Sequence, residues 1–270
     1  MKSPVLIELP VPLAPPPAQA LAAGLLATPA AIAPKYFYDA LGSRLFEAIT
    51  ELDEYYPTRT EAAILERHGS VIFGGLRAGI PLVELGAGSC RKVERVLQWT
   101  QPSSFVAVEI AASFAREGLE RLQERFPDLD LMAVGTDFSQ SLLLPPALTA
   151  GPLNLFYPGS SIGNFDPAGA LALLRSAAQA CAGGALVIGV DTVKDGAVLD
   201  AAYDDALGVT AAFNLNVLRH VNRLLGSDFD PGDWQHRAFY AAGRRRIEMH
   251  LEARHALSVR WPGGSRAFAA

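Results

Sequence analysis

Ten residues decide the fold of this chain: Val83-Glu84-Leu85-Gly86-Ala87-Gly88-Ser89-Cys90-Arg91-Lys92. An apolar run that carries one acidic residue breaks into two glycines, and a helical pattern resumes after them. Glycines have no side chain, so their backbone lets a ligand of nucleoside size approach closely. The stretch therefore predicts a strand, a tight turn and the start of a helix around a ligand site.

A second acidic residue strengthens this prediction. The apolar run 105–108 ends in Glu109, 23 residues after Gly86. An acid at about this spacing normally holds the ribose hydroxyls of a nucleotide. A third glycine is missing, because Arg91 and Lys92 stand where a dinucleotide site packs its helix closely. The pattern therefore favours a single nucleoside such as S-adenosylmethionine over NAD.

Strands and helices alternate between residues 80 and 191. We expect strands at 81–85, 105–108, 129–134, 153–157 and 185–190, and helices at 93–99, 111–126 and 168–182. Continuously apolar strands that alternate with helices indicate an α/β fold with a doubly wound, mostly parallel, Rossmann-like sheet covered on both faces. Ligands bind beyond the carboxyl ends of such strands. This rule places a set of candidates at one rim: Gly86, Glu109, Asp137, Phe138 and the loop 159–164.

Two flanking segments depart from this rhythm. Residues 36–66 are rich in aromatic side chains and are expected to form helices with a break at 55–59. Residues 195–225 have helical spacing, and residues 244–259 alternate as a strand or hairpin does. We therefore expect two domains: a nucleoside-binding core at 60–193 and a smaller substrate-binding lid formed by 1–59 and 194–270.

Composition narrows the class of protein. Half of the 270 residues are hydrophobic, 19% are charged and the net charge is −5, which gives no basic field for nucleic acid. Two cysteines and five scattered histidines have no metal-ligand spacing and suit a reducing compartment. The proline-rich start lacks the pattern of a signal peptide, and no stretch is long enough to cross a bilayer. We expect a soluble cytoplasmic monomer that binds neither nucleic acid nor membrane.

Several side chains allow either a functional or a structural interpretation. Asp137 and Phe138 either bind an adenine amine and pack its ring, or act as a helix cap and a core residue. Asn164 either orients a substrate amine or carboxylate, or caps a turn. The flank tyrosines either bind a carboxylate and stabilise a cation, or pack in a half-buried core; they are Tyr38, Tyr55, Tyr56 and Tyr203. No Ser-His-Asp or Cys-His set is evident, which suits methyl transfer, a reaction governed mainly by positioning.

Taken together, these motifs resemble the histidine Nα-methyltransferase family of the ergothioneine pathway. The resemblance covers nearly the whole chain from Pro34 on. It rests on these stretches: Pro34-Lys35-Tyr36-Phe37-Tyr38-Asp39, Gly42-Ser43-Arg44-Leu45-Phe46, Glu54-Tyr55-Tyr56-Pro57-Thr58-Arg59, Val83-Glu84-Leu85-Gly86, Pro158-Gly159-Ser160-Ser161-Ile162-Gly163-Asn164-Phe165, Tyr203-Asp204-Asp205, Thr210-Ala211-Ala212-Phe213-Asn214 and Ile247-Glu248-Met249.

The resemblance implies transfer of three methyl groups from S-adenosylmethionine to the α-amino group of L-histidine, which gives hercynine. It implies that Tyr55, Asn164 and Tyr203 hold the substrate carboxylate and amine, with Tyr38 near the amine. Tyr38, Asn164 and Tyr203 would then be catalytic, and Met249 would line the imidazole pocket. The implied cofactor residues are Gly86, Gly88, Lys92, Glu109, Asp137 and Phe138. The family usually has Asp at position 109, and Glu is an equivalent ribose acceptor one methylene longer.

One departure from the family concerns the end of the chain. The family continues into a Glu-x-Ser segment that recognises the imidazole and into the last strands of the sheet, and we expect this part to be absent from residues up to Ala270. An unpaired imidazole nitrogen would cost about 1–3 kcal/mol. Three alternatives therefore stay open: a methyltransferase acting on another amino acid or small amine, a truncated relative that binds ligands without catalysis, and, least favoured, an NAD dehydrogenase.

Overall fold

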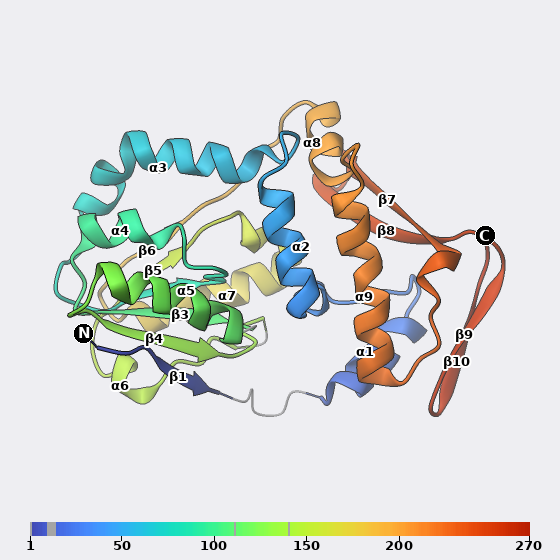
Figure 1. Ribbon diagram of the computed structural model, residues 1–270, viewed down its shortest axis with the longest axis horizontal. Helices are drawn as coiled ribbons and strands as arrows, with labels where there is room; N and C mark the ends of the chain where they lie inside the picture. Colours follow the sequence, from blue (N-terminus) through green and yellow to red (C-terminus); the bar gives the residue numbers. More distant parts are fainter. Residues whose placement is uncertain (1, 10–14, 111, 140) are drawn as a thin grey trace. The chain divides into compact units, whose positions relative to one another are not determined.

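The computed structural model describes residues 2–9, 15–110, 112–139 and 141–270, and the chain divides into two compact units (Figure 1). Unit 1 comprises Met1–Pro12 and Pro57–Asp191, and unit 2 comprises Leu13–Tyr56 and Thr192–Ala270. Each unit has hydrophobic cores of its own.

Unit 1 is built on a six-stranded parallel sheet with the order β1-β4-β3-β2-β5-β6. Its strands are β1 (Val5–Glu8), β2 (Leu82–Leu85), β3 (Ser104–Glu109), β4 (Asp130–Gly135), β5 (Asn154–Tyr157) and β6 (Leu186–Ile188). The chain leaves β2 toward β3 and β4 on one side and returns to β5 and β6 on the other. The carboxyl end of β2 therefore lies at the switch point where open α/β sheets bind ligands. The expected doubly wound parallel sheet is confirmed.

Helices cover both faces of this sheet. One core lies against α3 (Tyr56–Gly74), α4 (Val93–Thr100) and α5 (Ala112–Arg125), and the opposite core lies against α6 (Pro146–Thr149) and α7 (Pro167–Cys181). Along β3, Phe105 and Ala107 face the first core, whereas Val106 and Val108 face the second. Alternate strand residues point to opposite faces, so a strand buried on both sides is apolar throughout.

Strand β1 was not expected from the sequence. Val5–Glu8 pairs in parallel with Met132–Gly135 of β4, so the first residues of the chain belong to unit 1 and not to the predicted flank 1–59. At the other edge, no strand of the described chain pairs with the outer side of β6. Leu171 and Leu174 on the neighbouring helix α7 are exposed.

Unit 2 packs helices against two hairpins. The helices are α1 (Pro17–Leu26), α2 (Ala40–Thr50), α8 (Gly196–Tyr203) and α9 (Val209–Leu225), with short 3-10 turns η1 (Pro34–Phe37) and η3 (Pro231–Asp233). The long helix α9 contacts α1, α2, η1 and β7 (Figure 1). The hairpins pair β7 (Trp234–Ala241) with β8 (Arg246–Ala253) and β9 (Leu257–Trp261) with β10 (Gly264–Phe268).

Two local expectations in the flanks need correction. The stretch 55–59 was expected to break a helix, but α3 begins at Tyr56 and includes Pro57, where proline suits the first helical turn. The alternation in 244–259 covers β8 and the start of β9, whereas their partners β7 and β10 were not expected. The predicted helix 111–126 corresponds to α5, apart from residue 111, which lies outside the described residues.

Candidate active site

The glycine turn after β2 and the acid after β3 lie in direct contact. Gly86 and Gly88 have φ values of +68° and +52°, a backbone region that side chains disfavour. The Gly88 amide donates to Glu109 Oε2 at 3.0 Å, and the Ile110 amide donates to Glu109 Oε1 at 2.8 Å. The Glu109 carboxylate is thus held at the rim in an orientation that can accept from hydroxyl groups.

Of the next two rim residues, Phe138 lies against the same turn. Phe138 packs edge-on against Tyr157, with ring centroids 6.0 Å apart, and a Cβ added at Gly86 would lie 4.0 Å from the Phe138 ring. Asp137 Oδ1 accepts from the Ser139 amide at 3.0 Å. No atom of the described residues lies within 4 Å of a Cβ added at Gly88. The turn therefore offers an open backbone beside an aromatic ring and the Glu109 carboxylate, which suits an adenosine group.

Lys92 is anchored by a residue that the sequence did not single out. Glu61 on α3 accepts from Lys92 Nζ with Oε2 at 2.6 Å and from the Gly159 amide with Oε1 at 2.6 Å. Glu61 lies on an ordinary polar helix, so no local motif marks it. The contact joins the loop after β2 to the loop after β5.

Glu84, part of the stretch that precedes the glycine turn, received no role from the sequence. Glu84 is 1% exposed, and within the described structure its Oε2 is buried without a hydrogen-bond partner. Burial raises the pKa of Glu84 to about 8; the Lys92 ammonium opposes this shift, and the Glu61 and Glu109 carboxylates add to it. Glu84 therefore holds a proton near neutral pH.

The loop after β5 carries Asn164. It ends in the 3-10 turn η2 (Ser161–Asn164), in which Asn164 is exposed. Ser160 Oγ accepts from the Asp191 amide at 2.9 Å and so ties this loop to the segment after β6. No described contact joins Asn164 to the other predicted site residues.

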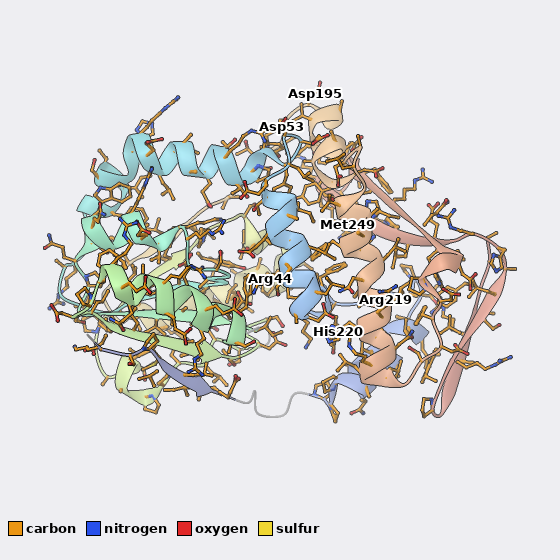
Figure 2. All side chains as sticks on the ribbon, viewed as in Figure 1. Arg44, Asp53, Asp195, Arg219, His220 and Met249 are labelled. Carbon is orange, nitrogen blue, oxygen red and sulfur yellow. The ribbon has the colours of Figure 1, made fainter. Side chains whose placement is uncertain are left out.

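In unit 2, the predicted tyrosines meet in one aromatic cluster. Tyr55 is 7% exposed, and its ring lies 5.8 Å from that of Tyr203 in a T-shaped arrangement. Tyr38 packs on Phe46 and Phe213, and Met249 on β8, labelled in Figure 2, packs against the same cluster. The sequence prediction grouped these side chains by resemblance, and the structure brings them together.

The pKa of Tyr55 is raised well above its usual value. Burial is the largest cause, followed by the charges that Tyr203 and Tyr38 would carry and a hydrogen bond with Tyr203. Tyr55 therefore stays a neutral phenol, which can donate a hydrogen bond but cannot act as a base near neutral pH.

His236 holds Tyr203 by its backbone carbonyl, and Asn214 in turn orients the His236 ring. The Tyr203 carbonyl accepts from His236 Nε2 at 2.9 Å, which leaves His236 Nδ1 to accept from the Asn214 side chain at 2.8 Å. Asn214 Nδ2 also donates to the His250 carbonyl at 2.9 Å. Asn214 was quoted only as part of a family motif, and His236 was not singled out, because its partners are distant in sequence.

No group of three or more metal-ligating side chains occurs among the residues that the structure places. Within those same ranges, no helix is both long and apolar enough to span a membrane.

An open parallel sheet with a glycine turn after β2 and a hydrogen-bonded acid after β3 defines a Rossmann-like, nucleoside-binding α/β enzyme. Within that class, the sequence profile described as "Histidine-specific methyltransferase, SAM-dependent" matches residues 17–270, and the chain belongs to this family. The chain is accordingly a methyltransferase that uses S-adenosylmethionine, as the missing third glycine indicated.

Curated relatives agree with the profile. The chain is 42% identical over 243 residues to "Histidine N-alpha-methyltransferase" of Mycolicibacterium smegmatis, covering 88% of this chain and 75% of the relative. It is 40% identical to the protein of the same name from Mycobacterium tuberculosis, covering 85% and 72%. It is 32% identical to "Ergothioneine biosynthesis protein 1" of Neurospora crassa, covering 78% of this chain and 26% of that one.

Solved structures are more distant. Magnesium protoporphyrin IX methyltransferase from Synechocystis, with bound S-adenosylmethionine, is 13% identical with a TM-score of 0.42, covering 63% of this chain and 82% of that one. CalS10, an amino pentose methyltransferase from Micromonospora echinaspora, is 14% identical with a TM-score of 0.38, covering 86% and 80%.

Proposed function

We propose that this enzyme methylates the α-amino group of L-histidine three times, with S-adenosylmethionine as methyl donor, and so forms hercynine for ergothioneine biosynthesis. The observation that carries the proposal is the identity of 40–42%, over most of the chain, to two proteins named histidine N-alpha-methyltransferase. The clustering of Tyr38, Tyr55, Tyr203 and Met249 in unit 2 supports it, because these are the side chains that the family resemblance assigns to histidine.

In this proposal, unit 1 binds the cofactor. The open backbone at Gly86 and Gly88 admits the adenosine group, and Glu109 accepts hydrogen bonds from its ribose hydroxyls. Asp137 accepts from the adenine amine, and Phe138 packs against the ring. Lys92 contributes an ammonium group at the same rim. When bound, S-adenosylmethionine supplies a methyl group whose bond to sulfur breaks as the bond to the amine nitrogen forms.

The family resemblance assigns the amino acid to the tyrosine cluster of unit 2 and to Asn164 of unit 1. The neutral phenol of Tyr55 and the hydroxyl of Tyr203 donate to the carboxylate, while Tyr38 and Asn164 orient the amine. Met249 lines the pocket for the imidazole. An α-amine has a reference pKa near 8, so a proton leaves the nitrogen before each attack. Tyr55 is excluded as the group that takes this proton, because its own pKa is raised.

The proposal also covers the location and the oligomeric state of the enzyme. We infer a cytoplasmic monomer that does not bind nucleic acid, in line with its net charge of −5 and its two free, buried cysteines.

The first experiment is calorimetric titration with histidine, without and with S-adenosylhomocysteine, followed by mass analysis of products formed from S-adenosylmethionine. We expect cofactor-dependent binding of histidine and mass gains of one, two and three methyl groups. If another amino acid is methylated in preference to histidine, that amino acid, and not histidine, is the substrate. Binding of both ligands without any product would point to a non-catalytic relative.

Variants test the residue roles. Tyr55→Phe and Asn164→Ala should each weaken histidine binding by about 10- to 100-fold, the cost of removing a hydrogen bond to a charged group, and leave S-adenosylhomocysteine affinity nearly unchanged. Tyr240→Phe is a matched control, because Tyr240 packs against the same cluster without an assigned role. Equal losses of affinity for both ligands would contradict the assignment.

A further inference from the structure

Glu61 contacts two loops of the site although it belongs to neither. It projects from the second turn of α3, and its side chain is 16% exposed. Its two carboxylate oxygens have separate partners: Oε2 accepts from the Lys92 ammonium and Oε1 from the Gly159 amide, both at 2.6 Å. Both oxygens of the Glu61 carboxylate therefore accept hydrogen bonds from groups at the rim.

Glu61 bonds residues after two strands and lies close to the end of a third. Lys92 follows β2, Gly159 follows β5 and Gly189 follows β6, and these strands are adjacent in the sheet. A Cβ added at Gly189 would lie 2.4 Å from Glu61 Oε1, so the absence of a side chain there admits the carboxylate. Gly159 has a φ of +75°, which aims its amide at Glu61 in a conformation that favours glycine.

Several charged groups surround the ion pair between Glu61 and Lys92. Lys92, Glu61 and Glu109 all lie near enough to Glu84 to act on its titration. The 2.6 Å ion pair with the Glu61 carboxylate gives the Lys92 ammonium one position among these groups. The second oxygen of Glu61 holds the start of the loop that leads to Asn164.

We propose that Glu61 is a positioning residue that fixes both the Lys92 ammonium and the start of the loop after β5. It thereby holds the cofactor-binding loop and the loop bearing Asn164 in a fixed arrangement. The inference rests on the proposed function for the roles of Lys92 and Asn164. Glu61 acts through these two partners and does not itself touch the ligands.

The chain offers substitutions that separate the two contacts. Glu61→Gln keeps an oxygen that can accept from the Gly159 amide but places an amide donor against Lys92, which breaks the ion pair. Glu61→Ala removes both contacts. Glu66→Gln is a matched control on the same helix, because Glu66 forms a more exposed ion pair with Arg95 at 3.5 Å.

We expect Glu61→Gln to weaken S-adenosylhomocysteine binding about tenfold in calorimetry, the scale of one lost charge-assisted hydrogen bond. In kinetics, the KM for S-adenosylmethionine should rise by about the same factor, with a smaller change in kcat. Glu61→Ala should in addition raise the KM for histidine, since the Gly159 loop is then released. Glu66→Gln should leave both constants unchanged.

A double-mutant cycle with Lys92→Met decides whether Glu61 acts through Lys92. Glu61→Gln should cost little cofactor affinity when Lys92 is already Met, because the partner it positions is gone. Fully additive losses, or wild-type affinity in Glu61→Gln, would overturn the proposal. If Glu61→Ala does not fold, Glu61→Gln and the cycle still decide it. Failure of the wild type to bind or methylate histidine would instead count against the proposed function, since the cofactor measurements need no histidine.

Discussion

At the scale of single residues, Glu84 shows how strongly position alone changes a carboxyl group. It occupies a strand that is buried along its whole length, pairs in register with Ala107 and Phe156, and lacks a hydrogen bond on Oε2. An ionised carboxylate without a partner is costly to bury, so the proton stays on and the pKa rises to about 8. Its sequence neighbours do not reveal this, because the shift depends on strands that meet only in the folded sheet.

Glu84 gives the stability of the protein a pH dependence. The folded protein keeps a proton that the unfolded chain releases above its ordinary pKa near 4.5, so the contribution is complete below pH 4.5 and lost as pH rises through about 8. Between pH 5 and 8, we expect the free energy of unfolding in urea to fall by a few kcal/mol, on the order given by the shift. Glu84→Gln should flatten this slope.

The comparison uses unfolding curves at pH 5, 6, 7 and 8 for both proteins, with Glu66→Gln as an exposed control on α3. A slope in Glu84→Gln equal to that of the wild type would show that another group causes the pH dependence.

At the scale of elements, the glycine turn is supported by a helix that the motif does not include. A Cβ added at Gly118 on α5 would lie 2.4 Å from the Ser89 carbonyl oxygen and 2.7 Å from its carbon. Close packing on the turn, which a dinucleotide motif obtains from its third glycine, comes here from Gly118. The sequence predicts a helix at 111–126 and assigns no role to Gly118.

Gly118→Ala should therefore displace the turn. Alanine improves the intrinsic helix propensity by about 1 kcal/mol, but the clash is with backbone, which cannot rotate away. We expect S-adenosylhomocysteine affinity to fall about tenfold or more in calorimetry, with a net loss of stability. Gly74→Ala on α3 is the matched control, since nothing described lies within 4 Å of its added Cβ. Equal affinities for the two variants would exclude the packing role.

Helix α9 depends on a side-chain cap outside its first turn. Asp205 Oδ2 accepts from the Val209 amide at 2.9 Å and Oδ1 accepts from the Thr210 amide at 2.7 Å. Burial raises the pKa of Asp205, but hydrogen bonds from Thr210 and Val209 outweigh it, and the net pKa is lowered. The cap therefore stabilises the fold above the ordinary pKa of an aspartate and weakens as pH falls through the lowered value.

Asp205→Ala should lower the free energy of unfolding by about 1–2 kcal/mol at neutral pH, the usual cost of a lost cap. Asp205→Asn keeps an acceptor and should cost less. Thermal or urea unfolding followed by circular dichroism measures both. A loss of stability in Asp205→Asn as large as that in Asp205→Ala would show that charge, and not the hydrogen bonds, carries the effect.

At the scale of the whole molecule, the predicted residues separate between the two units. The glycine turn, Lys92, Glu109, Asp137, Phe138 and Asn164 belong to unit 1, whereas Tyr38, Tyr55, Tyr203 and Met249 belong to unit 2. Each unit buries its own apolar side chains, so ligand binding to one can be followed separately in hydrogen exchange.

Hydrogen exchange should therefore report the two ligands in different segments. S-adenosylhomocysteine should slow exchange in 82–92 and 104–110, and histidine added to that complex should slow it further in 52–56 and 196–205. The hairpin of β9 and β10 is the internal control, since no assigned residue lies on it. Protection by histidine confined to unit 1 would contradict the assignment of the tyrosine cluster.

The sequence by itself determined the parallel sheet and the class of cofactor. The central strands of unit 1 are buried on both faces, so a continuous apolar run in the sequence predicts each of them. The glycines and Glu109 lie at spacings that strand geometry dictates. The roles of the tyrosines and Met249 are predicted only through longer family motifs, because aromatic residues in a core and in a binding pocket have the same local pattern.

Only the tertiary structure decided which groups meet across the sheet. Strand β1 is short and mostly exposed, and it is defined by pairing with β4 rather than by its own pattern. Glu61 meets Lys92 and Gly159 across 31 and 98 residues of sequence. Glu84 owes its proton to burial, and the carboxylates of Glu61 and Glu109 add to the rise in its pKa. Such groups are set by long-range packing and by the low polarity it creates, and neither is encoded in the neighbouring residues.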